Sequence, residues 1–218
     1  MRKLSKAQKV FLTILFLLAF SCTYLYLSKK RQRQLVKSST EWIESYQGSY
    51  TYAPMPKWFT SSPGFIKDIL SNFIVVDIES INLSRTSVSI ISSLEEFPEL
   101  KYLNLEETKI GNIDFLTTNQ HLIELKIGSS PISDLSPLLK LPKLEKLDIS
   151  ETKISNFDVI SQLSELNSLA LRGLKIQSYE FLFRLKKLKT LEVDKSFTTE
   201  VIEKIKKLQP DCNILISP

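Results

Sequence analysis

The chain repeats itself every 22 residues, and this period limits its possible folds more than any other feature. One series of apolar residues at this interval comprises Ile78, Leu100, Leu122, Leu144, Leu166 and Leu188. Two further series follow three and five residues along the chain: Ile81, Leu103, Leu125, Leu147, Leu169 and Leu191, and Leu83, Leu105, Ile127, Ile149, Leu171 and Val193. A constant period of this length is typical of solenoids, whose repeats stack and share one core. We therefore predict about six stacked repeats over residues 78–197.

Each repeat combines two kinds of apolar spacing, which are clearest in residues 144–163. Leu147 and Ile149 alternate with polar residues, as in a short strand that turns one face inward. After Ile154 the apolar residues recur at every third position, a spacing that suits 3₁₀ turns. Each repeat is thus predicted to form a strand, a sharp turn and a short helical return. Successive strands would then lie parallel, about 4.8 Å apart, which makes the fold class α/β.

Small hydroxyl residues form a column just after the predicted strands: Thr86, Thr108, Ser130, Thr152 and Ser196. A hydroxyl at a sharp corner can bond backbone groups that have no partner in the strand ladder. We interpret this column as structural rather than catalytic. Leu174 interrupts it, so we expect that corner to be satisfied in another way.

The spacing LxxLxLxx(T/S)x(I/V) resembles a leucine-rich repeat, and segments such as LSPLLKLPKLEKLDISETKI resemble the internalin-like repeats of bacteria. Thr or Ser replaces the usual corner Asn, as in the threonine-type repeats of predicted bacterial surface proteins. The resemblance covers residues 62–216 and implies a solenoid with a parallel sheet on its concave face and short 3₁₀ or helical returns. The ending TTEVIEKIKKLQPDCNILI resembles the helix, proline break and final strand of a C-terminal cap, which we place at 198–218.

In proteins of this kind, the usual binding surface is the concave face, where strand residues point outward. The resemblance therefore implies a partner-binding set: Tyr102, Asn104, Glu106, Glu124, Lys126, Lys146, Asp148, Ser150, Arg172 and Glu192. Interface hot spots favour Tyr and Arg, so Tyr102 and Arg172 are the best anchor candidates. Small residues at positions 128, 150 and 170 would leave a hollow beside them.

Opposite charges fall on neighbouring predicted strands of this face. Glu124 stands beside Lys146, and Lys126 stands beside Asp148. Such pairs could simply bond laterally and keep the sheet soluble, each contributing about 0.2–1 kcal/mol. The alternative, that they recognise a partner, stays open.

The net charge of +5 is unevenly distributed. Residues 1–37 carry nine Lys/Arg and no Asp/Glu, whereas residues 38–218 carry 20 Lys/Arg against 24 Asp/Glu. The positive charge thus flanks one apolar segment and does not form a nucleic-acid-binding face. That segment, 10–27, has eighteen uncharged residues, enough at about 1.5 Å each to cross a hydrocarbon core of about 30 Å. We predict a basic tail at 1–9 and a transmembrane anchor at 10–27.

Two other fates of the apolar segment stay open: ordinary signal-peptide cleavage, and lipoprotein processing at Cys22, because residues 18–22 loosely resemble a lipobox. The numbers of basic residues on the two flanks are nearly equal, so the positive-inside rule gives almost no preference for either orientation. A short basic N-terminal tail usually stays in the cytoplasm. We therefore expect the repeats on the outer, periplasmic or extracellular, side of the membrane.

Between the anchor and the repeats we predict a stalk and connector at 28–61, followed by an N-terminal cap at 62–77. Three prolines within 48–63 suggest that this stretch contains no regular element. Its aromatic residues would either cover the end of the solenoid or form a binding patch: Tyr50, Tyr52, Trp58 and Phe59. Residues 63–70 would form the helix of the cap.

Nothing in the sequence indicates catalysis, a cofactor or a metal site. His121 is the single histidine and is expected at the surface. Cys22 and Cys212 fall in different segments and make no disulfide framework, and no HExxH, CxxC or phosphate-binding glycine loop occurs.

We therefore hypothesise a membrane-anchored binding module that recognises a protein, or alternatively a glycan, through its concave sheet. The rival hypothesis is a structural or scaffolding membrane protein that binds through its aromatic N-terminal segment or its convex face. The third and weakest hypothesis is an enzyme whose catalytic carboxylates converge across repeats.

Overall fold

The structure is a computed structural model that describes residues 30, 31, 34, 37, 38, 40–55, 78–91, 94 and 97–217. The chain divides into two compact units, Met1–Ser39 with Pro54–Val76, and Thr40–Ala53 with Asp77–Pro218. In the first unit, the described positions 30, 31, 34, 37 and 38 are helical. The predicted anchor at 10–27 and the predicted cap at 62–77 lie outside the described residues. Among the residues that are described, no helix is both long and apolar enough to cross a membrane.

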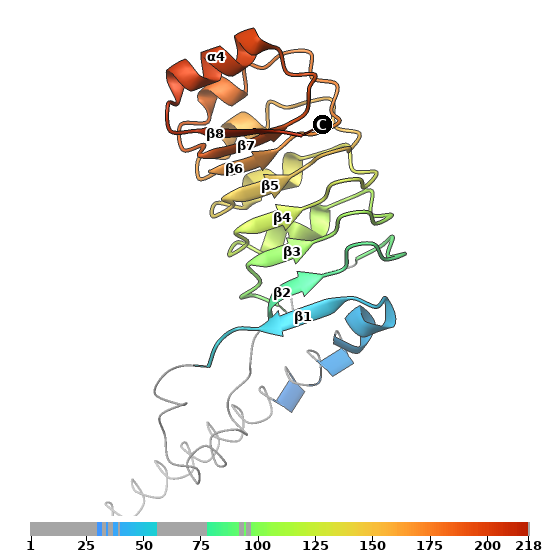
Figure 1. The fold of residues 1–218 in the computed structure, drawn as a ribbon. Helices are drawn as coiled ribbons and strands as arrows, with labels where there is room; N and C mark the ends of the chain where they lie inside the picture. The colour runs from blue at the N-terminus through green and yellow to red at the C-terminus, as the bar shows by residue number, and fades with distance from the viewer. Residues whose placement is uncertain are drawn as a thin grey trace, which may run out of the picture. The chain divides into compact units, whose positions relative to one another are not determined.

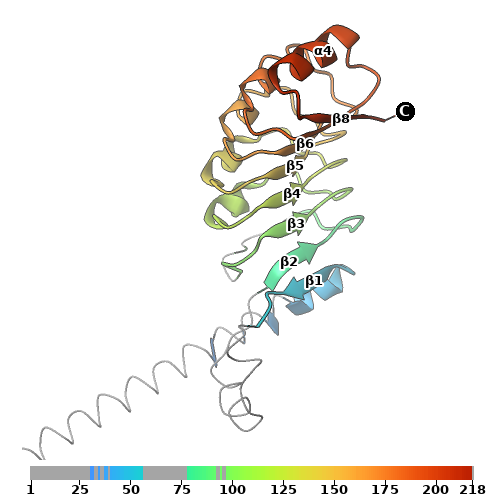
Figure 2. The ribbon, with the colours of Figure 1, turned by 60° about the vertical axis from the view of Figure 1, so that its left-hand side comes forward.

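The second unit is a solenoid whose eight strands form one sheet in the order of the chain (Figures 1 and 2). The strands that carry the repeat pair in parallel, and each aligned position lies 22 residues from the next. This confirms the predicted parallel solenoid and its register. The strands are β2 (Ile78–Asn82), β3 (Tyr102–Asn104), β4 (Glu124–Lys126), β5 (Lys146–Asp148), β6 (Ser168–Ala170) and β7 (Thr190–Val193).

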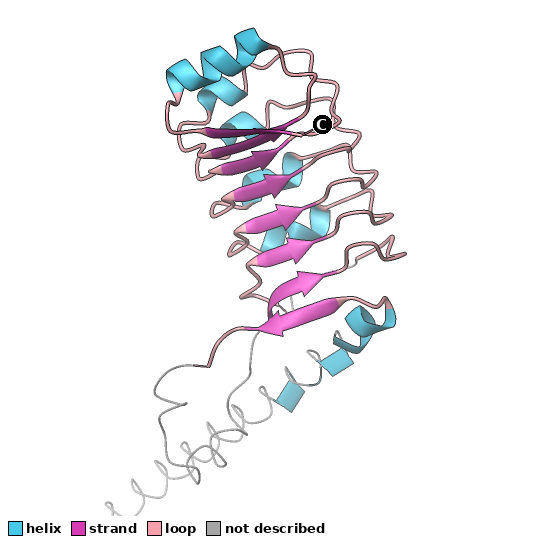
Figure 3. Cartoon of the chain, viewed as in Figure 1, coloured by secondary structure: helices cyan, strands magenta, loops and turns pink. Residues whose placement is uncertain are grey.

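The returns between β3 and β7 are short 3₁₀ helices on the opposite side of the core from the sheet (Figure 3). They are η1 (Asp114–Thr118), η2 (Ser136–Lys140), η3 (Ile160–Gln162) and η4 (Leu182–Arg184). Each buries one apolar residue completely, and these residues again stand 22 apart: Leu116, Leu138, Ile160 and Leu182. They meet the inward residues of the strands in one core, as the threefold spacing predicted.

The hydroxyl column bonds the backbone at the corners, as predicted. Four of the five hydroxyls donate to the carbonyl three residues earlier, so Thr108 bonds Leu105 at 2.8 Å and Thr152 bonds Ile149 at 2.6 Å, whereas the Ser196 side chain bonds Asp194. Thr86 and Ser130 form the same bond to Leu83 and Ile127. At the corner where Leu174 replaces the hydroxyl residue, the N–H of Gly173 donates to the Asp194 carboxylate at 2.5 Å. Hydrogen bonds from Ser196 and Gly173 lower the pKa of Asp194.

A second feature of the corners was not predicted: one residue in each adopts a left-handed backbone conformation. Their φ angles lie between 54° and 71°, at the same 22-residue interval: Arg85, Glu107, Ser129, Glu151 and Gly173. At a positive φ the Cβ atom of a residue lies too close to its own backbone. Glycine avoids this clash because it has no Cβ. Gly173 is thus the one residue of this series, within the described corners, that adopts the conformation without a steric cost.

Replacing Glu107 by glycine is expected to stabilise the solenoid by about 0.5–1 kcal/mol, because the left-handed strain disappears. The lost ion pair with Arg85 joins side chains that are 79% and 50% exposed, so it contributes little. Urea denaturation followed by circular dichroism measures the change. The control is Glu106→Gly, because Glu106 does not have a positive φ. Glycine at this position is expected to lower the free energy of unfolding by about 0.5–1 kcal/mol. Equal destabilisation by both variants would contradict the strain argument.

The N-terminal end of the solenoid is covered in part by residues 40–52. Strand β1 (Ser49–Tyr52) pairs antiparallel with β2, and residues 40–45 are helical. Ile43 in this helical stretch is fully buried. The prediction that residues 48–63 hold no regular element is wrong for β1, because the strand ends before Pro54 removes a backbone donor. Tyr50 donates to Glu44 at 3.0 Å, and this bond, together with a hydrogen bond with Tyr52 and burial, raises the pKa of Tyr50 to about 12.

The C-terminal end has the predicted helix, proline and strand. Helix α4 (Thr199–Leu208) is capped by Thr198, whose hydroxyl accepts from the Val201 N–H at 3.4 Å. Strand β8 (Asn213–Ile216) then pairs parallel with β7. Ile205 and the free thiol of Cys212 are buried beneath this cap, and burial raises the pKa of the Cys212 thiol. The thiol is therefore placed for packing and not for reaction.

Candidate partner-binding face

The outward-pointing residues of the parallel strands form two columns, as the period predicted. The first contains Ser80, Tyr102, Glu124, Lys146, Ser168 and Thr190, and the second contains Asn82, Asn104, Lys126, Asp148, Ala170 and Glu192. We call this surface the sheet face. Side chains of unequal size leave two hollows on this face.

The larger hollow has a volume of about 290 Å³ and lies over β4 to β7. Seven of the ten predicted binding residues line it: Glu106, Glu124, Lys126, Lys146, Asp148, Arg172 and Glu192. Residues from four parallel strands and the corners that follow them therefore converge on one place. The register carries them there, since positions 22 apart in the chain are neighbours in space.

Ion pairs fix several of these side chains. Lys146 lies 3.3 Å from Glu124 on the neighbouring strand, so the predicted lateral pair is confirmed. Lys126 and Asp148 lie on neighbouring strands as predicted, since they are register partners, but among the described residues each forms its ion pair with another side chain. Lys126 reaches Glu124 on its own strand at 3.7 Å, and Asp148 lies 3.7 Å from Arg172. The reason is that Asp148 also accepts the Ser150 N–H at 2.9 Å, which turns its carboxylate toward the corner.

The small residues predicted to open a hollow do so only in part. Ala170 lines the larger hollow, but Gly128 and Ser150 do not. Ser150 is 4% exposed, and its hydroxyl accepts the Arg172 backbone N–H at 3.2 Å. It therefore holds Arg172 from below rather than facing a partner.

The smaller hollow has a volume of about 190 Å³ and lies over β2 to β4. It contains two of the remaining three predicted residues, Tyr102 and Asn104, together with Ser80, Asn82, Glu124 and Lys126. Tyr102 is 39% exposed, which makes it the one large aromatic side chain on the described sheet face that is open to solvent. The two proposed anchors, Tyr102 and Arg172, thus belong to different hollows.

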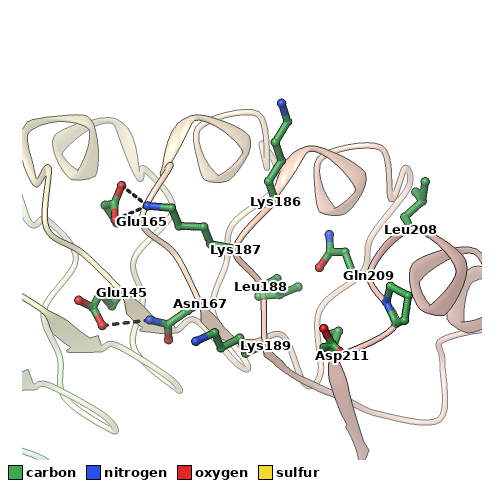
Figure 4. Close-up of a pocket in the computed structure, with 12 residues that line it drawn as sticks. Glu145, Glu165, Asn167, Lys186, Lys187, Leu188, Lys189, Leu208, Gln209 and Asp211 are labelled. Carbon is green, nitrogen blue, oxygen red and sulfur yellow. Dashed lines mark hydrogen bonds and ion pairs between the residues drawn. The ribbon is translucent and has the colours of Figure 1, made fainter.

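A third and larger groove, of about 600 Å³, was not predicted (Figure 4). It lies where the chain enters the last strands, beside residues 186–189 and 208–212. Helix α4 has ten residues where the other returns have three to five, so the last return departs from the stack. Four polar side chains of the groove bond one another, as the dashed lines in Figure 4 show. Lys187 lies 2.6 Å from Glu165, and Asn167 donates to Glu145 at 3.0 Å.

The structure places His121 at the surface, where its Nδ1 lies 3.4 Å from Glu99 and its side chain is 42% exposed. Across the described ranges, no three His, Cys, Asp or Glu side chains are grouped so as to hold a metal ion. The sheet face thus presents exposed polar side chains, several of them fixed by ion pairs, on a parallel sheet.

Neither a protein-family model nor a curated protein matches the chain. Among solved structures, a leucine-rich-repeat protein of Leptospira interrogans is 28% identical, with a TM-score of 0.54 over 62% of this chain and 36% of its own. The Listeria monocytogenes internalin InlF is 19% identical, with a TM-score of 0.48 over 69% of this chain and 53% of its own. Internalin C2 of the same species is 17% identical, with a TM-score of 0.48, over 70% and 76%.

The chain thus spans about a third of the Leptospira protein and about half of InlF. The likeness to the Leptospira protein concerns the fold. The second unit of this chain is therefore a leucine-rich-repeat solenoid similar to those of bacterial leucine-rich-repeat proteins.

Proposed function

We propose that the chain is a membrane-anchored leucine-rich-repeat module that recognises a protein through its sheet face. The observation that supports this most is the larger hollow, where seven predicted binding residues converge. Arg172 is 40% exposed there, and both Asp148 and the Ser150 hydroxyl hold it in place. A guanidinium fixed in this way loses little entropy on binding, which is what makes arginine effective at interfaces.

The larger hollow is shallow relative to a small-molecule pocket, and its lining side chains carry both signs of charge. Such a surface suits an extended, charge-matched protein surface better than a buried small ligand. Affinity would come from area spread over several repeats. The anchor is the uncharged segment 10–27, and the repeats would lie on the outer side of the membrane.

Removing two sheet-face cations, by Lys146→Ala with Arg172→Ala, is expected to lower partner capture at least tenfold. Alanine removes the fixed charges, which for a buried interface pair are worth about 2 kcal/mol or more. The measurement is crosslinking of the tagged chain on intact cells with a membrane-impermeant reagent, followed by quantification of each captured protein.

A matched control removes two cations from the other side of the solenoid, by Arg184→Ala with Lys186→Ala, both exposed. This variant is expected to capture the partner as well as the wild type does. Equal capture by both double variants would refute the sheet-face assignment. Capture only after the cells are permeabilised would instead refute the outer location and leave the binding surface intact.

A further inference from the structure

The smaller hollow combines uncharged hydrogen-bonding groups, one aromatic ring and one pair of opposite charges. Tyr102 lies between Ser80 and Glu124 on adjacent strands, and Asn82 is the register partner of Asn104. The charged residues of its lining, Glu124 and Lys126, lie 3.7 Å apart and cancel. The lining thus carries no net charge, which favours an uncharged ligand over an acidic or basic one.

The two asparagines are fixed so that each offers donors. The side-chain oxygen of Asn82 accepts the Ser84 N–H at 2.9 Å, and that of Asn104 accepts the Glu106 N–H at 2.9 Å. An asparagine has one carbonyl acceptor and an NH₂ group with two donors. Because each side-chain oxygen already accepts one backbone N–H, the NH₂ groups supply the unused donors for a ligand. They belong to neighbouring strands and are therefore separated by about one strand spacing, about 4.8 Å.

We propose that this hollow is a subsite for an uncharged saccharide, a hexose or an N-acetylhexosamine. The sugar ring would pack its C–H groups on Tyr102, and two of its oxygens would accept from the NH₂ groups of Asn82 and Asn104. A sugar hydroxyl would donate to Glu124. This subsite adds to the protein recognition proposed above and adjoins the larger hollow, with which it shares Glu124 and Lys126.

A saccharide fits better than a peptide for a reason visible in the lining. Ile81 and Leu103 are at most 1% exposed, so Tyr102 is the apolar surface that the hollow offers. A peptide anchored by apolar side chains needs a pocket to bury them. A sugar instead needs one flat ring and several fixed donors and acceptors, and each hydroxyl can both donate and accept.

The sharpest test is the double variant Asn82→Asp with Asn104→Asp, because it removes the donors and keeps the fold. An aspartate can form the same turn: Asp148, in the same column, accepts the Ser150 N–H at 2.9 Å. The full chain, purified in a detergent without a sugar headgroup, is applied to an array of uncharged oligosaccharides. The array carries α- and β-linked oligomers of glucose, galactose, mannose and N-acetylglucosamine, and titration calorimetry follows for those retained.

We expect at least one oligosaccharide to be retained by the wild type, and its affinity to fall about tenfold or more in the Asn→Asp double variant. Tyr102→Ala should lower the affinity by a similar factor, and Arg172→Ala should leave it unchanged. Retention of none by the wild type, or unchanged affinity in the Asn→Asp variant, would overturn the proposal. Loss of protein capture in the Asn→Asp variant without any saccharide binding would assign the hollow to the protein interface and overturn it equally.

These outcomes are separate from those of the protein-capture experiment. Lys146→Ala with Arg172→Ala tests the larger hollow and leaves the asparagines in place. A chain that retains a saccharide but captures no protein would support the subsite and refute the proposed function. A chain that captures a protein but retains no saccharide would support the proposed function and refute the subsite.

Discussion

Leu125→Ala is expected to destabilise the solenoid by about 3–4 kcal/mol, the cost typical of a leucine removed from a rigid core. Leu125 is fully buried in β4, at the middle of the sheet. Its register partners Leu103 and Leu147 are buried too, so the cavity opens between three repeats. In a solenoid each repeat is held by its neighbours, and a weak central interface can uncouple the two halves.

Urea denaturation monitored by circular dichroism measures this loss. The matched control is Lys126→Ala, one residue along the same strand, where the side chain is 42% exposed and points outward. Its effect should stay within about 0.5 kcal/mol. A broadened or two-step transition in Leu125→Ala alone would show the halves unfolding separately. A loss below about 1 kcal/mol would mean that the leucine columns do not share one core.

The leucine columns were predictable from sequence because one physical cause sets them. A repeat cannot bury its apolar side chains alone, so every repeat must place them at equivalent positions. The register of the sheet, the 3₁₀ returns and the corner hydroxyls follow from that period. Seven residues of the candidate face were brought together for the same reason, since alignment in sequence becomes adjacency in space.

Features that depend on one residue's surroundings could not be predicted in this way. The left-handed corners occupy residues as different as Arg85, Glu107 and Ser129, so no residue type marks them. Asp148 pairs with Arg172 because the bond from the Ser150 N–H turns the Asp148 carboxylate toward the corner, and no sequence pattern predicts that orientation. Strand β1 lies outside the period, and the nearby prolines concealed it because they follow the strand instead of interrupting it.

Gly48→Ala tests that strand and is expected to destabilise the protein by about 1–3 kcal/mol through overpacking. A Cβ at this position would lie 2.6 Å from Cδ2 of Leu83 and 2.9 Å from the backbone oxygen of Asn82. The leucine could move, but the oxygen belongs to the strand with which β1 pairs. Relief therefore requires β1 to separate from β2. Thermal and urea denaturation measure the loss.

Gly111→Ala is the matched control, because a Cβ there would meet no atom within 4 Å. It should be neutral or stabilise by up to about 1 kcal/mol, since alanine restricts the unfolded chain. Equal stability of the two variants would show that residues 40–53 do not pack on the first repeat. The result also bears on recognition, because β2 carries Ser80 and Asn82 of the smaller hollow. If β1 holds β2 in place, then Gly48→Ala should weaken saccharide binding while leaving capture through Arg172, four strands away, unchanged.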